Sequence, residues 1–228
     1  TDLMARFAER GYFDQDTVGV ESQLSGGPYL DLGTSLGRVG ADRDEFFAHA
    51  ERTHALFHHL FDGLADPVQT IYGSLARLAA GKTVMTAEED GQRYGPAIFR
   101  IYHGQEGHKA HIDSARRRTK SEYAVSRFAH QFAGILCVQK GTIGSDSIIY
   151  RAKSEGKLAE VVERGEFEAY AKAQNLPRVQ IELNPGDLYF FYTENIHNLP
   201  QIARDRTRVV LAVFVGMSPE VDEIFVWS

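Results

Sequence analysis

Apolar side chains recur every three or four residues along two stretches in the first half of the chain. The first stretch starts at Asp42, a typical N-cap residue with Glu45 three positions later, and continues to about Gly63. The second starts at Asp66-Pro67, where proline would occupy the first helical position, and continues toward Gly81. This spacing predicts two amphipathic helices.

The pattern changes at Pro96, where apolar and polar positions begin to alternate. Phe99 and Ile101 alternate with Arg100 and Tyr102, which is the period-two signature of a strand. Further strands are predicted over residues 123–138, 147–151, 178–183, 188–192 and 206–216, with a turn at 184–187 and a short helix over 165–173. Residues 1–40 are rich in glycine and weakly patterned, which indicates an arm or a lid.

Several strands joined by variable loops, with helices gathered ahead of them, predict a mainly β protein with N-terminal helices. The architecture that suits this order is a two-sheet sandwich or jelly roll backed by helices. A length of 228 residues is within the range of one domain. We expect residues 1–92 to form an N-terminal arm and helical support, and residues 93–228 to form the β core.

Composition narrows the class of function. A formal net charge of −6 argues against a surface that neutralises phosphates, so nucleic acid is not an expected partner. No run of about 18 apolar residues occurs, which argues against a membrane partner, and the start of the sequence lacks the apolar region of a secretory signal. Cys137, the only cysteine, lies in an apolar run, so a reducing, cytoplasmic location is expected.

His111 and Asp113 are the strongest candidates for chemistry. They are two residues apart, so at a strand end their side chains project to the same side, as a chelate requires. His197 follows the predicted strand at 188–192, and in a sandwich these strand ends can be neighbours. Two imidazoles and one carboxylate on one face of an octahedral metal leave three open positions, the arrangement of non-haem iron(II) oxygenases.

The order of motifs around these residues resembles the 2-oxoglutarate-dependent iron(II) dioxygenases. Pro185-Gly186-Asp187-Leu188-Tyr189-Phe190-Phe191, then Asn195-Ile196-His197, then Arg206-Thr207-Arg208-Val209-Val210-Leu211 are similar to the distal half of their core. His111 and Asp113 resemble the proximal half. The resemblance implies a double-stranded β-helix core, a jelly roll of the cupin-like kind, and Fe(II), 2-oxoglutarate and O2 as cofactor and cosubstrates.

In that family a basic residue after the second ligand histidine pairs with the distal carboxylate of 2-oxoglutarate. Arg206, nine residues beyond His197, resembles this residue by position, and Arg208 is the second candidate. A guanidinium suits the role because its planar fork binds a carboxylate through two parallel hydrogen bonds. The family often has Ser or Thr where Arg208 stands, which leaves the choice between the two arginines open.

A narrower resemblance concerns the substrate. Tyr94-Gly95-Pro96-Ala97-Ile98-Phe99-Arg100, Phe128-Ala129-His130-Gln131-Phe132-Ala133-Gly134 and the aromatic C-terminal segment are similar to small oxygenases that hydroxylate or chlorinate free amino acids, typified by lysine halogenases. A small-molecule substrate, a free amino acid, is therefore implied. Ser114 stands where lysine-halogenating members carry an acidic residue, which argues against a cationic side chain.

Other substrate-binding candidates remain open from the sequence alone. His108 either reaches a substrate carboxylate or lies on a surface loop, and Arg100 lines the cavity or faces solvent. Trp227 either packs in the core or closes a substrate pocket.

Halogenases of the related group carry a small residue, typically Gly, at the position of Asp113, and chloride takes the vacated place. The presence of a carboxylate here implies hydroxylation, with release of succinate and CO2. Two alternatives remain: a protein or peptide hydroxylase of the prolyl-hydroxylase type, and a non-catalytic β-sandwich protein that binds a structural metal.

Overall fold

The structure, a computed structural model, describes residues 2–13, 23–24, 29–103, 107–117, 122–142, 144, 146–201 and 206–228. Its helices are α1 (Asp2–Glu9), α2 (Leu36–Val39), α3 (Arg43–Leu60), α4 (Pro67–Leu78), α5 (Lys157–Glu163) and α6 (Phe167–Ala173), with a 3-10 turn at Ala124–Arg127. Its strands are β1 (Gln23–Leu24), β2 (Leu30–Gly33), β3 (Thr83–Thr86), β4 (Glu88–Glu89), β5 (Gln92–Arg93), β6 (Ile98–Tyr102), β7 (His108–His111), β8 (His130–Gln139), β9 (Ile148–Lys153), β10 (Arg178–Gln180), β11 (Leu188–Tyr192), β12 (Asn195–Leu199), β13 (Arg208–Met217) and β14 (Glu223–Trp227).

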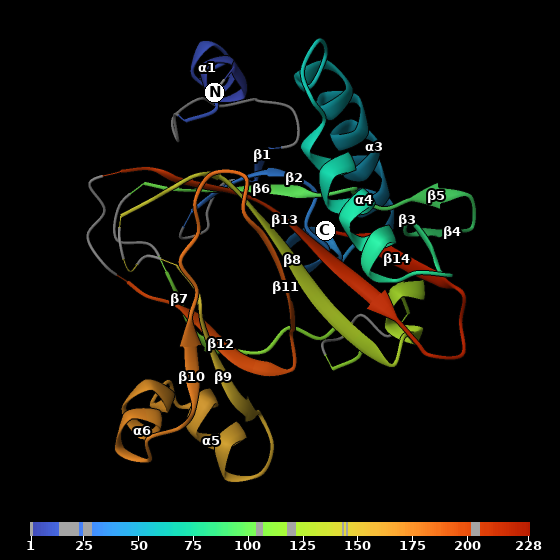
Figure 1. Ribbon diagram of the computed structural model, residues 1–228. Helices are drawn as coiled ribbons and strands as arrows, with labels where there is room; N and C mark the ends of the chain where they lie inside the picture. The colour runs from blue at the N-terminus through green and yellow to red at the C-terminus, as the bar shows by residue number, and fades with distance from the viewer. Residues whose placement is uncertain are drawn as a thin grey trace.

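Two sheets form the body of the molecule (Figure 1). The larger sheet is built around β13, which pairs with β6 and then β14 along one edge and with β8 along the other. It extends through β2 and β1 on one side, through β11 beyond β8, and through β3 beyond β14. The smaller sheet has the order β10-β9-β12-β7. This arrangement confirms the predicted mainly β jelly roll, a double-stranded β-helix with helices against it.

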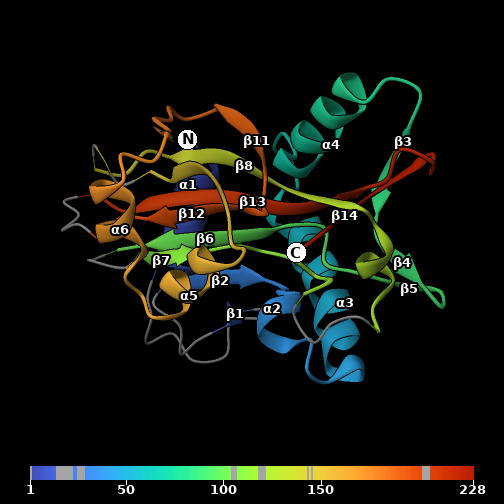
Figure 2. The same cartoon turned by 90° about the horizontal axis from the view of Figure 1, so that it is seen from below.

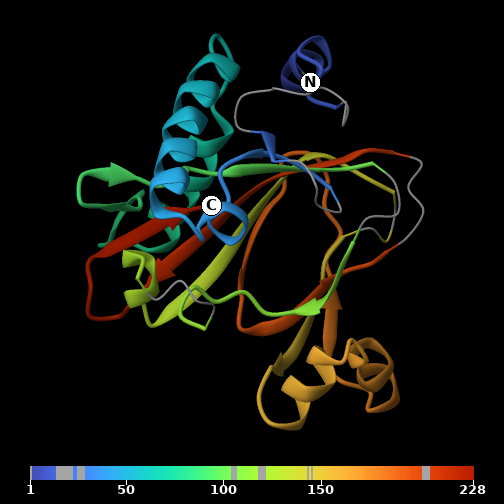
Figure 3. The same cartoon turned by 180° about the vertical axis from the view of Figure 1, so that it is seen from behind.

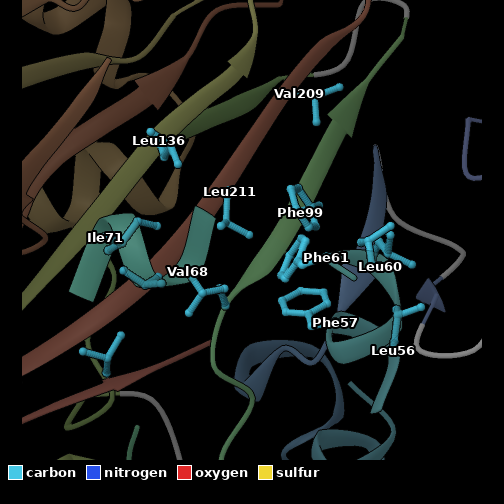
Figure 4. Packing of buried hydrophobic residues seen from close by; sticks show 14 of the residues in the cluster. Leu56, Phe57, Leu60, Phe61, Val68, Ile71, Phe99, Leu136, Val209 and Leu211 are labelled. Carbon is cyan, nitrogen blue, oxygen red and sulfur yellow. The ribbon is translucent and has the colours of Figure 1, made fainter. Parts of the chain in front are cut away.

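Helices α3 and α4 pack on the outer face of the larger sheet, whereas α5 and α6 lie at the far end of the smaller sheet (Figures 1 and 3). Seen from below, α5 and α6 stand in front of the strands (Figure 2). The side chains Phe57 and Ile71 from the helices meet Phe99 and Leu211 from β6 and β13 in one buried cluster (Figure 4). Side chains alternate between the two faces along a strand. The residues next to Phe99 and Leu211 in β6 and β13, including Arg100, therefore point toward the smaller sheet.

The two predicted helices are confirmed, and so are the reasons for their starts. The Asp42 side chain accepts a hydrogen bond from the backbone N–H of Glu45 at 3.0 Å, and Asp66 accepts one from Val68 at 2.8 Å. Both bonds satisfy backbone donors that the first helical turn leaves free. Within the described residues, no helix has the length and apolar character needed to cross a membrane.

The structure differs from the predicted strands in several places, and strands β3, β4, β5 and β14 were not predicted. The stretch 123–138 begins with the 3-10 turn, so strand β8 starts only at His130. Strand β12 was not predicted, and β7 was assumed only as a strand that ends near His111, because Asn-Ile-His-Asn-Leu and His-Lys-Ala-His show little alternation. Strand β2, in the segment expected to be an arm or a lid, is buried and pairs with β6.

Candidate metal and cosubstrate site

The three expected metal ligands come together on the smaller sheet. His111 ends β7 and is the direct cross-strand partner of His197 on β12, so the second histidine lies within a strand and not after one. The ligating atoms of these residues and Asp113 all lie within 4.8 Å of one another. The Asp113 Oδ2 atom is 3.3 Å from Nε2 of His197 and 3.7 Å from Nε2 of His111. Neighbouring ligands at about 2.1 Å from an octahedral metal are about 3 Å apart, so the set needs only a small contraction.

Backbone carbonyls fix the tautomers of both histidines. The Nδ1 atom of His111 donates to the carbonyl of Lys109 at 2.7 Å, and Nδ1 of His197 donates to the carbonyl of Asn195 at 2.9 Å. A carbonyl can only accept, so each Nδ1 is the donor, and each Nε2 is the ring nitrogen left for a metal. Both rings are therefore oriented as metal ligands by the residue two positions before them.

Asp113 lies beyond the end of β7, where no strand pairing holds it, and Thr193 takes over that role. The backbone N–H of Asp113 donates to the Thr193 carbonyl at 3.1 Å, and the Thr193 hydroxyl lies 2.7 Å from the Asp113 carbonyl. The same hydroxyl is 3.0 Å from the carbonyl of Gln131 on β8. Thr193, which is completely buried, therefore ties the carboxylate ligand to both sheets.

A cavity between the sheets opens beside these ligands. Its wall on the larger sheet includes Arg100 and Tyr102 from β6 and Arg208 from β13, and its wall on the smaller sheet includes His108 and Asn198. Several buried polar atoms of this lining have no hydrogen-bond partner among the described residues: Nε of Arg100, Nε2 of His108 and Oδ1 of Asn198. Buried polar atoms are rarely left without partners, so these atoms are suited to a polar ligand that enters the cavity.

The comparisons with known proteins agree with this geometry. The model of the family described as "Carrier-protein-independent halogenase WelO5" matches residues 8–228. The chain belongs to this family. Its enzymes are non-haem iron oxygenases that depend on 2-oxoglutarate, so the chain is an iron(II)- and 2-oxoglutarate-dependent dioxygenase.

Two solved structures of one enzyme show the same fold at low sequence identity. Two structures of an N-substituted L-amino acid dioxygenase from Burkholderia ambifaria AMMD, one of them in complex with alpha-KG, match 100% of this chain and 82% of that chain. Their TM-scores are 0.59 and 0.60, at 17% and 15% identity. HygX from Streptomyces hygroscopicus, with nickel and 2-oxoglutarate bound, matches 97% of this chain and 80% of that chain, with a TM-score of 0.47 and 13% identity. No curated protein matches the sequence.

The site residues fit the cofactor and cosubstrate of the family. Two imidazoles and a carboxylate are the donor set that iron(II) takes in such enzymes. The unpartnered Nε of Arg100 is a donor suited to a carboxylate, and 2-oxoglutarate carries two carboxylates.

The two candidate arginines for the distal carboxylate occupy different surroundings. Arg206 is exposed, precedes β13 and does not line the cavity. Arg208 is the first residue of β13, is 3% exposed and lines the cavity. Its Nε donates to Asp146 Oδ1 at 3.0 Å, and its guanidinium lies over the Tyr102 ring at 5.2 Å. The placement favours Arg208, the second candidate from the sequence.

His108 lines the cavity and is not a surface loop residue. Its ring centroid lies 5.5 Å from that of His111 and 4.7 Å from that of Tyr29. Burial, reinforced by the positive charge of Arg100, lowers the pKa of His108 to about 3. The imidazole is therefore neutral at physiological pH and offers one donor and one acceptor.

A smaller apolar lobe lies on the other side of the carboxylate ligand. It meets the main cavity at Asp113 and Phe214, which line both. Its remaining walls come from α2, the segment after Asp113, and strands β8 and β14: Leu36, Gly37, Ser114, Ala115, Gln131 and Trp227. Ser114 and Trp227 thus both reach this lobe, and Trp227 also packs in a buried aromatic cluster. Among the described residues that line this lobe, Asp113 is the only charged one.

Two acidic residues of the site carried no signal in the sequence. Asp146 binds Arg208, and the completely buried Asp31 contacts Arg100, with its Oδ1 3.8 Å from Nε. Each lies far from its arginine along the chain and outside any motif. Only the pairing of strands brings them behind the cavity wall.

Proposed function

We propose that this protein is a hydroxylase that inserts one oxygen atom of O2 into an unactivated C–H bond of a small substrate. Iron(II), 2-oxoglutarate and O2 supply the oxidising chemistry, and the other oxygen atom leaves in succinate as CO2 is released. His111, Asp113 and His197 would hold the metal, and Arg208 would hold the distal carboxylate of the cosubstrate. The chain's own contribution is to position these groups and to exclude water.

The observation that carries this proposal is the carboxylate of Asp113. Its Oδ2 atom lies beside the Nε2 atoms of both histidines, so it would take the third protein position on the metal. Chloride would have to displace this side chain or add a second negative charge next to it. The family includes halogenases, but this chain lacks the small residue that makes room for chloride in the related group.

The substrate we propose is a free amino acid or a close derivative with an uncharged side chain. The apolar lobe next to Asp113 has the right position for the part of the substrate that presents its C–H bond. Leu36, Phe214 and Trp227 offer no partner for a charged group. The N-substituted L-amino acid dioxygenase with the same fold is consistent with this class of compound.

The test begins under anaerobic conditions. Adding Fe(II) and 2-oxoglutarate together should give a visible charge-transfer band, and His197→Ala should abolish it. In air, free and N-substituted amino acids are screened for stimulated succinate release, and products are analysed by mass spectrometry in excess chloride and under isotopic O2. We expect one labelled oxygen atom in the product. A chlorine isotope pattern in the main product would refute hydroxylation.

The same screen separates the alternatives. Succinate formation stimulated only by proteins or peptides would favour a prolyl-hydroxylase type of enzyme. Absence of the band and of any 2-oxoglutarate turnover would favour a non-catalytic metal-binding protein.

A further inference from the structure

Arg100 stands closer to the metal ligands than Arg208 does. Along the paired strands, Arg208 is opposite Tyr102 and Arg100 is opposite Val210, two residues further along β13. Continuing in this direction, β13 reaches Phe214, which lines the lobe beside Asp113. Arg100 therefore lies between the distal anion site and the metal.

The spacing of the two arginines suits a dicarboxylate. Two residues of a strand span about 7 Å. The two carboxylate carbons of extended 2-oxoglutarate are separated by four C–C bonds of about 1.5 Å each, or about 5 Å in a zigzag. One guanidinium for each carboxylate is thus compatible with the position of Arg100 and Arg208 on one wall of the cavity.

The carboxylates that pair with the two arginines also support one bound carboxylate at Arg100. Arg208 faces one carboxylate, Asp146, so that pair is neutral. Asp31 is shared between two cations: its Oδ2 is 2.8 Å from Arg38, and its Oδ1 is 3.8 Å from Arg100. The cluster of Arg38, Asp31 and Arg100 therefore keeps one positive charge, and Arg100 is its member in the cavity.

Aromatic neighbours hold the Arg100 side chain in this place. Its guanidinium lies over the Tyr29 ring at 5.5 Å and donates a hydrogen bond to the Tyr102 hydroxyl. Burial alone would lower the pKa of Arg100, but neighbouring groups raise it overall: Tyr29, Asp31, Tyr102 and the ligand Asp113. The side chain is therefore charged and within electrostatic reach of the metal site.

We propose that Arg100 binds the carboxylate of 2-oxoglutarate that lies next to the metal, while Arg208 binds the distal carboxylate. This inference rests on the proposed function. It makes Arg100 a cosubstrate-positioning residue, with the buried carboxylate of Asp31 beside it.

The experiment compares 2-oxoglutarate with 2-oxobutyrate, which keeps the 2-oxo acid group but lacks the distal carboxylate. Their dissociation constants are measured anaerobically with Fe(II) from the charge-transfer band. Arg100→Met should weaken both compounds by a similar factor, on the order of tenfold to a hundredfold, as expected for a lost charge-assisted hydrogen bond. Arg208→Met should weaken 2-oxoglutarate at least as much and leave 2-oxobutyrate unchanged.

Arg38→Met is the matched control, because Arg38 also binds Asp31 but does not line the cavity. It should weaken both compounds much less than Arg100→Met does, because it removes a charge of the cluster but leaves the guanidinium that contacts the carboxylate. Arg100→Lys keeps the charge and should bind both compounds with affinities between those of wild type and Arg100→Met. This variant still tests the role of the charge if Arg100→Met does not fold. Circular dichroism and Fe(II) affinity should be unchanged in every variant.

The inference is overturned if Arg100→Met binds both compounds as wild type does, including the case in which only the KM of the amino-acid substrate rises. It is also overturned if Arg38→Met causes the same loss as Arg100→Met. Absence of a band in the wild-type protein would instead refute the proposed function, so the two failures are distinguishable.

Discussion

Acid should destabilise this protein through His49, a buried histidine of α3. Its Nδ1 atom lies 3.0 Å from the hydroxyl of Thr34, which is 2.7 Å from the hydroxyl of Thr53. The Thr53 hydroxyl in turn donates to the His49 carbonyl at 3.1 Å. This network joins α3 to the segment between β2 and α2, which leads into a wall of the apolar lobe. Protonation would place a charge inside the network.

The size of the effect follows from the pKa. Burial, with a smaller contribution from the positive charge of Arg52, lowers the pKa of His49 from 6.5 to about 4. Between these values the unfolded chain binds more protons than the folded one, so stability falls as the pH drops below 6.5. For a single group with these two pKa values, going from pH 7.5 to pH 5.0 costs about 2 kcal/mol of unfolding free energy.

The assay is urea unfolding at both pH values for wild type and for His49→Gln, which cannot titrate. The variant will be less stable at pH 7.5, but its loss between the two pH values should be smaller than that of wild type by about 2 kcal/mol. Comparing the two proteins cancels the contributions of the other histidines. An equal loss in both proteins would show that His49 does not titrate as its burial implies.

Three further predictions concern the site. Arg208→Met should raise the dissociation constant of 2-oxoglutarate by at least about 30-fold, since truncating one side of a desolvated charge pair costs about 2–5 kcal/mol, whereas Arg206→Met should have little effect in the same titration. Thr193→Val should weaken Fe(II) binding on the order of tenfold or more in a chelator competition, and Thr193→Ser, which keeps the hydroxyl, should not. Gly37→Leu should block the apolar lobe and lower kcat/KM without changing 2-oxoglutarate binding; Gly37→Ala, whose added carbon meets only the Ser35 hydroxyl at 3.7 Å, should be tolerated.

Local signals predicted helices α3 and α4 well, because their caps act within a few residues. Asp42 and Asp66 bond to the first turn that follows them, so the sequence contains the whole interaction. Strands β7 and β12 are different, since they are short and polar and pair with strands far away in the sequence. The candidate ligand set could still be proposed, because His111 and Asp113 are two residues apart in one motif and His197 lies in a second motif.

The choice between Arg206 and Arg208 shows where sequence reasoning fails. The two residues are two positions apart, so strand alternation would place both side chains on the same face. What separates them is the start of β13 at Arg208, a boundary set by pairing with Tyr102 of β6. Arg206 lies outside that pairing and is exposed. Such a boundary depends on tertiary contacts and has no local marker.

The cross-strand pairing of His111 with His197 also has a consequence for stability. Strand β7 is the last strand at one edge of the smaller sheet, and its register with β12 shifts within a few residues. A metal bound by one imidazole from each strand would cross-link β7 to β12, as a disulfide does. Because only the folded chain presents the three ligands together, each gain in free metal concentration stabilises the native state by mass action. The supply of iron would therefore govern how long the protein persists in the cell as well as how fast it turns over.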